Sequence, residues 1–126
     1  MITDDYVNFE IAKLLKEKEF DGECRDYYHT DGHFYSEDFK SNWNDDREGI
    51  ALTLFSAPTI QMATKWFLKK HNIFICVLFL EESNGFGYTI ENIITKKYIA
   101  TSKNSSYKEP EEACEAAIKH CLEKLL

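Results

Sequence analysis

Eight consecutive apolar residues, Ile73–Leu80, constrain the fold of this chain more than any other feature. The run is far shorter than the roughly 20 residues that a helix needs to cross a bilayer. Its length suits a β-strand, and its lack of alternation indicates that the strand is central in its sheet or covered on both faces. The neighbouring sequence must therefore supply partner strands and covering helices.

Residues 59–126 contain the elements that such a strand needs. The sequence Ser83-Asn84-Gly85 favours a hairpin turn directly after the apolar run. Asn72, just before it, can end a helix in the left-handed conformation. The patterns predict a helix over residues 59–71, strands over Ile73–Leu80, 86–93 and Lys97–Thr101, and a last helix over residues 110–126.

The last helix carries a wide apolar stripe, with residues that recur at spacings of three and four. These residues are Cys114, Ala117, Ile118, Cys121, Leu122 and Leu125. A stripe of this length is unfavourable in water. We therefore expect Ile118 and Leu122 to be buried against the sheet, with Trp66 and Phe67 from the preceding helix nearby.

The first 56 residues are predicted to add a helix and a hairpin. Asn8 is a suitable N-cap for a helix over residues 9–18, because its side chain can accept from the amides of the first turn. Asp31-Gly32 lies between two aromatic runs and predicts a hairpin turn. Residues 37–49 are polar and predict a mobile loop, whereas residues 50–55 predict a further strand or a buried connector.

Together these elements predict an α+β fold in a single domain of residues 1–126. Residues 57–126 are expected to form a helix–three-stranded antiparallel sheet–helix unit. Residues 1–56 are expected to form an acidic extension with an N-terminal helix, a short β-hairpin and a loop.

Acidic residues are concentrated in the first part of the chain. Residues 1–56 contain six Lys or Arg against fourteen Asp or Glu, a net charge of −8, whereas residues 57–126 contain nine against eight, a net charge of +1. An acidic surface repels nucleic-acid phosphate and favours basic partners. Asp4 and Asp5 also stand where a secretory signal peptide carries positive charge. We expect a cytoplasmic protein that does not associate with a membrane.

The four cysteines, at positions 24, 76, 114 and 121, contain no C-x-x-C pair. Cys114 and Cys121 would lie about 10 Å apart along one helix, which is too far for a disulfide. Three of the four stand in apolar surroundings, where free cysteines behave as small hydrophobic residues. We expect all four to be reduced.

No motif in the sequence identifies a reaction. Cys24, His29 and His33 flank one predicted hairpin, but zinc requires a tetrahedral set and no fourth ligand is evident. The acidic residues Asp26, Asp31, Glu37, Asp38, Asp45, Asp46 and Glu48 lack the fixed stagger of a calcium loop. The sequence therefore predicts a non-enzymatic protein with no catalytic residues, no metal site and no cofactor.

The segments SAPTIQMATKWF (residues 56–67), EEACEAAI (residues 111–118) and LLKEK (residues 14–18) carry a family resemblance. They resemble parts of small uncharacterised proteins from prophages and mobile elements of Bacteroides-type gut bacteria, which contain APT-x-x-x-A-x-K-W-L and Y-E-E-A-x-E-A-x-I. The chain departs from their pattern at Pro110, where they have an aromatic residue, and at Glu19, where they have glycine. The resemblance implies a bacterial or phage setting and no catalytic activity.

The order of helix, three strands and helix also resembles that of double-stranded RNA-binding domains. Those domains bind phosphates with lysines at the start of their last helix. Here that position holds Glu109, Glu111 and Glu112, which would repel phosphate. Nucleic-acid binding remains the alternative function, and it would require a shared surface for Lys65, Lys69, Lys70, Lys96 and Lys97.

Aromatic residues in the acidic first part favour a protein interface. Clustered aromatic side chains outside a core are typical of binding surfaces. The aromatic residues expected to be exposed there are Tyr27, Tyr28, Phe34, Tyr35, Phe39 and Trp43, and all of them except Phe39 are named as interface candidates. The sequence therefore predicts a non-catalytic accessory protein that binds another protein, and it defines neither that partner nor the oligomeric state.

Overall fold

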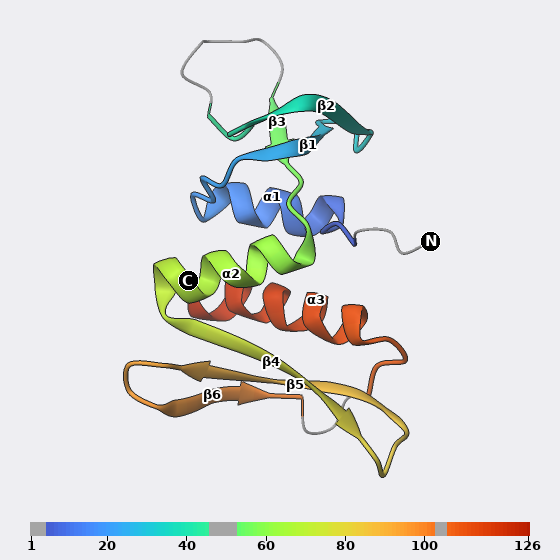
Figure 1. Cartoon of the computed structure of the whole chain (residues 1–126), viewed down its shortest axis with the longest axis vertical. Helices are drawn as coiled ribbons and strands as arrows, with labels where there is room; N and C mark the ends of the chain where they lie inside the picture. The colour runs from blue at the N-terminus through green and yellow to red at the C-terminus, as the bar shows by residue number, and fades with distance from the viewer. Residues whose placement is uncertain (1–4, 46–52, 103–105) are drawn as a thin grey trace. The chain divides into compact units, whose positions relative to one another are not determined.

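A computed structural model of the chain describes residues 5–45, 53–102 and 106–126. These residues form an α+β structure with three α-helices and two three-stranded antiparallel sheets (Figure 1). The backbone contacts divide the chain into two compact units, Met1–Thr59 with Leu126, and Ile60–Leu125. The predicted α+β class is confirmed, its detailed arrangement is matched in part, and the single domain stays a prediction.

The first unit contains one helix and one sheet. Its elements are α1 (Phe9–Glu17), β1 (Cys24–His29), β2 (Phe34–Ser41) and β3 (Leu54–Ser56), with the strand order β2-β1-β3. The predicted hairpin turn is confirmed: Gly32 has a φ of 87°, a conformation that glycine adopts without steric cost. Asn8 caps α1 as expected, since its Oδ1 accepts from the amide of Ile11 at 2.8 Å.

One prediction for this unit was wrong in part. Residues 37–41 belong to β2 and not to a loop, because an irregularity in the pairing lets the strand continue: Asp26 pairs with Ser36, yet Cys24 pairs with Ser41. Residues 42–45 follow β2 without strand structure, and residues 46–49 of the predicted loop lie outside the described residues. Of the two alternatives for residues 50–55, the structure has a strand at Leu54–Ser56, which pairs with the other side of β1.

The second unit has the predicted order of helix, three strands and helix. Its elements are α2 (Ile60–His71), β4 (Ile73–Leu80), β5 (Gly85–Asn92), β6 (Lys97–Thr101) and α3 (Pro110–His120), which continues as a π-helical turn, η1 (Cys121–Leu125). Asn72 ends α2 with a φ of 58°, in the left-handed conformation expected for it. The strand order is β4-β5-β6, so β5 is the central strand.

The core of the second unit lies between α3 and one face of this sheet. The helix packs against β4 and β5, and α2 contacts both β4 and α3 (Figure 1). Ile118 and Leu122 are 0% and 1% exposed, and Ile90 of β5 and Phe67 of α2 are fully buried as well. The expected burial of the last helix against the sheet is therefore confirmed.

Strand β4 is neither central in its sheet nor covered on both faces, as its unbroken apolar run had predicted. The strand lies at the edge of its sheet and pairs with β5 alone. Alternate side chains point to the face under α3 and to the opposite face, where Phe74 and Leu78 are 43% and 40% exposed. Phe79, near the end of the strand on the face toward α3, is 54% exposed. The prediction of a central or doubly covered strand was wrong for this chain taken alone, because its helices cover only one face.

Candidate functional site

The five aromatic residues predicted to form an interface do not share one surface. Tyr27 and Tyr28 are neighbours in β1, and Phe34 and Tyr35 are neighbours in β2, so each pair points to opposite faces of the sheet. Tyr28 and Phe34 lie on the face toward α1, with ring centroids 5.4 Å apart. The Tyr28 hydroxyl donates to the Val7 carbonyl at 2.7 Å, which fixes this residue within the packing of the first unit.

The other face of the first sheet carries a continuous row of aromatic rings, which we call the aromatic array. It contains His29, Tyr35, Tyr27, Trp43 and Phe39. Successive ring centroids lie 4.4, 5.9, 4.5 and 5.6 Å apart, within the range of favourable aromatic contacts. Three predicted residues thus meet in one array, with two members that were not predicted for it.

Hydrogen bonds hold the centre of the array in place. The indole Nε1 of Trp43 donates to the Cys24 carbonyl at 2.7 Å. The Tyr27 hydroxyl donates to Oε2 of Glu37 at 2.6 Å, and this hydrogen bond to a carboxylate raises the pKa of Tyr27 to about 12. Tyr27 is only 8% exposed. The two hydrogen bonds fix the orientation of the central rings, and the Tyr27 hydroxyl stays protonated at neutral pH.

Two rings of the array are open to solvent. Tyr35, the second ring of the row, is 43% exposed, and Phe39, at one end of the row, is 57% exposed. Aromatic side chains with preset positions lose little conformational entropy on binding. The array thus combines a buried central ring, Tyr27, with an exposed ring on either side of it.

Carboxylates accompany the array. Glu37 accepts from Tyr27, and Asp31 interacts electrostatically with His29 at the other end. The backbone amide of His33 donates to Asp31, which lowers the pKa of that carboxyl and keeps it ionised at neutral pH. Aromatic faces next to carboxylates attract cations such as the guanidinium of arginine.

The candidate zinc and carboxylate sites gain no support from the geometry. The described residues contain no group of three or more potential metal ligands. Burial of the Cys24 thiol raises its pKa to about 12, which opposes the thiolate form that zinc requires. Asp26 is buried and accepts from the Ser36 hydroxyl. Asp46 and Glu48 lie outside the described residues.

The structure brings four of the five candidate lysines to one end of the second unit. Lys69 and Lys70 end α2, Lys96 lies in the β5–β6 turn and Lys97 begins β6. The amide of Ile93 in that turn donates to the Asn72 carbonyl at 3.0 Å, so the segments that carry the two lysine pairs are joined at this end of the unit. The fifth, Lys65, lines a shallow hollow between α2 and the start of β4.

Comparisons of the chain with protein-family models, with curated proteins and with solved structures found no match. Within the described residues, no helix has both the length and the apolar composition needed to cross a membrane.

Proposed function

We propose that this chain is a non-catalytic accessory protein of a phage or mobile element, and that its aromatic array binds a basic segment of another protein in the cytoplasm. The observation that carries the proposal is the row of five rings with its two exposed members, Tyr35 and Phe39. The sequence resemblance described above supports the bacterial or phage setting.

Charge favours a basic protein segment over nucleic acid as the ligand. Stacked aromatic rings can bind nucleobases as well as cations. Nucleobases, however, bring phosphates with them, and Asp31 and Glu37 beside the array would repel those phosphates. Arginine and lysine side chains gain attraction from both the ring faces and the carboxylates. Each such contact at an exposed site contributes about 0.5–1 kcal/mol.

Capture of a partner from bacterial host lysate should depend on the two exposed rings of the array. We expect tagged full-length protein to retain a partner, and the double variant Tyr35→Ser, Phe39→Ser to retain several-fold less of it. Both side chains are exposed, so the variant should keep its fold. The matched control is Phe79→Ser, which removes an aromatic ring that is 54% exposed in the second unit. Mass spectrometry of the retained fraction provides the measurement.

The same experiment separates the alternative function from the proposed one. The grouping of Lys69, Lys70, Lys96 and Lys97 favours nucleic acid as a second candidate ligand. A partner held through nucleic acid would be lost after nuclease treatment and would be insensitive to Tyr35→Ser, Phe39→Ser. Loss of the partner after nuclease treatment, together with unchanged capture by the double variant, would contradict the proposed function and favour nucleic-acid binding.

A further inference from the structure

One face of the second sheet has no helix over it among the described residues of its unit (Figure 1). The side chains of β4 on this face are Phe74, Cys76, Leu78 and Leu80, at alternate positions of the apolar run. Leu80 leans over the neighbouring strand, since a Cβ added to Gly87 would lie 2.9 Å from its Cδ1. We call this surface the open face.

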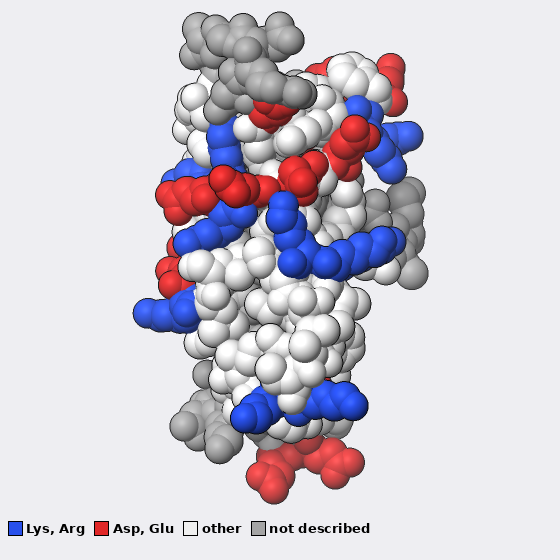
Figure 2. All heavy atoms as spheres, turned by 90° about the vertical axis from the view of Figure 1, so that its left-hand side faces the viewer, with Lys and Arg blue, Asp and Glu red and all other residues white. Residues whose placement is uncertain are grey.

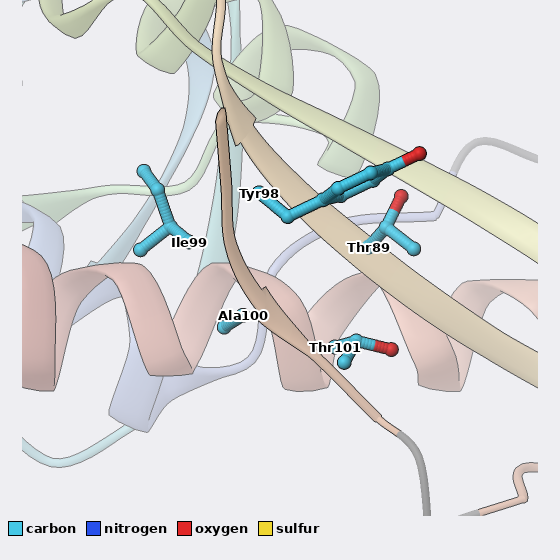
Figure 3. A pocket seen from close by; sticks show the side chains of 5 residues that line it. All are labelled: Thr89, Tyr98, Ile99, Ala100 and Thr101. Carbon is cyan, nitrogen blue, oxygen red and sulfur yellow. The ribbon is translucent and has the colours of Figure 1, made fainter. Parts of the chain in front are cut away.

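Strand β6 completes the open face with a large exposed ring. Tyr98 is 72% exposed. Figure 3 shows Tyr98, Thr89 and Thr101 on one side of β6, with Ile99 on the other side. Thr89 of β5 pairs with both Cys76 and Thr101, so these residues form a row across the centre of the face. The open face is therefore apolar along β4 and weakly polar along β5 and β6.

One end of the open face is basic. The β5–β6 turn brings Lys96 and Lys97 to this end, where it is joined to the segment that carries the lysines at the end of α2. Glu91, which pairs with Phe74 and Tyr98, is an acidic residue next to this end. Four lysines against this carboxylate leave the end with net positive charge.

The opposite end is acidic. Glu81 and Glu82 occupy the β4–β5 turn and are exposed. The amide of Phe86 donates to the Tyr107 carbonyl at 2.7 Å, which brings the start of α3 to this end. Its residues Glu109, Glu111 and Glu112 outnumber the single Lys108. Separate groups of basic and acidic side chains are visible beside a mostly uncharged surface in the lower part of Figure 2.

We propose that the open face binds the open face of a second copy of this chain, with the strands of the two copies antiparallel. The apolar run of β4 is of the kind that is normally covered on both faces, and a single chain covers only one. A second sheet packed face to face supplies the missing cover, as in a β-sandwich. The proposal concerns the second unit and is independent of the aromatic array.

The charges at the two ends select the orientation of the second copy. The two-fold axis of such a pair lies in the plane between the two sheets. If the axis is perpendicular to the strands, each basic end lies over the acidic end of the other copy, which is attractive. If the axis is parallel to the strands, ends of like charge lie over each other. The attractive arrangement stacks β4 over β4 of the second copy, so that Cys76, at the centre of its apolar side chains, lies near Cys76 of that copy.

Charge reversal at one end should weaken the association. We expect the wild-type chain to sediment as a dimer at low salt. The variants Lys96→Glu, Lys97→Glu and Glu81→Lys, Glu82→Lys should each self-associate at least tenfold more weakly. The first variant has two negative ends, and the second has no net negative charge left at its acidic end, so in both the attraction between unlike ends is lost. The four changes are in exposed turn and strand-end positions, so the fold should be retained.

A mixed sample makes the test specific. An equimolar mixture of the two double variants should form a heterodimer, because the unchanged basic end of one copy then lies over the unchanged acidic end of the other. A monomeric wild-type chain at high protein concentration, or a mixture that stays monomeric, would overturn the proposal. The variant Tyr35→Ser, Phe39→Ser should dimerise like the wild type, which separates this result from the function of the aromatic array.

Cross-linking reports the predicted geometry directly. Stacked sheets lie about 10 Å apart, a distance that a short bismaleimide can span between two thiols. The wild-type dimer should be cross-linked through Cys76, and Cys76→Ser should prevent this. Burial raises the pKa values of Cys114 and Cys121 to about 11 and 12, so these thiols should react slowly. Cross-links that persist in Cys76→Ser would contradict the orientation.

Discussion

Replacing Leu122 by alanine should lower the free energy of unfolding by about 2–5 kcal/mol, the range for a buried leucine whose removal leaves a cavity. Leu122 is 1% exposed and lies in the core between the last helix and the second sheet. A domain of this size has only about 5–15 kcal/mol of stability in total. Thermal denaturation should therefore show a clearly lower melting temperature, by roughly 4 °C for each kcal/mol lost.

Glu123→Ala is the matched control for this substitution. Glu123 is the next residue in the same helical turn, and its side chain is exposed. Its replacement should change the free energy of unfolding by less than about 0.5 kcal/mol, as is usual at surface positions. Equal melting temperatures for Leu122→Ala and the wild type would contradict the packing of the last helix against the sheet.

Replacing Leu15 by alanine should destabilise the first unit by a similar amount, about 2–5 kcal/mol. Leu15 is 0% exposed and belongs to the buried side of α1, with Ile11 and Ala12. Because the sequence predicts one domain, calorimetry should show a single transition that Leu15→Ala shifts downward as Leu122→Ala does. Glu17→Ala, at an exposed position of the same helix, should have little effect.

Two separate transitions, of which Leu15→Ala shifts only one, would contradict the single domain. The two compact units would then be independent domains. A normal melting temperature for Leu15→Ala would instead contradict the burial of the α1 stripe.

Elements specified by local sequence could be predicted, and pairings between distant segments could not. Asn8 acts through its side chain on the first turn of its own helix, and Asn72 and the Asp31-Gly32 turn act through their own backbone conformation. The structure has all three as expected. Strand β3 depends on pairing with β1, which lies 25–29 residues earlier in the sequence. The apolar pattern of residues 50–55 indicated a strand or a buried connector, but no local pattern identified β1 as the partner.

The apolar run of β4 shows a second limit of sequence patterns. Hydrophobicity indicates that a side chain prefers burial, but it does not distinguish burial inside one chain from burial against another. Phe74 and Leu78 were therefore assigned to a covered strand, although this chain leaves them 43% and 40% exposed. The proposed dimer accounts for the difference between the pattern and the single chain.

The aromatic array was predictable in part. Composition drew attention to the aromatic residues of the hairpin, and strand alternation alone would have separated Tyr27 and Tyr35 from Tyr28 and Phe34. Phe39 was counted among the exposed aromatic residues of this part but not among the interface candidates, and His29 was considered only as a metal ligand. The position of Trp43 depends on its hydrogen bond to the Cys24 carbonyl, which sequence alone does not indicate.

The most direct test of the proposed function is a fluorescence titration in which Trp43 is the only tryptophan. The variant Trp66→Phe removes the other one, which lies in the second unit. A synthetic peptide that alternates arginine and glycine should change the Trp43 emission saturably and more strongly at low salt, and Phe39→Ser should weaken its affinity by roughly fivefold, the equivalent of about 1 kcal/mol. No saturable change with the arginine peptide, or an equal change with a peptide that has glutamate in place of arginine, would contradict the account.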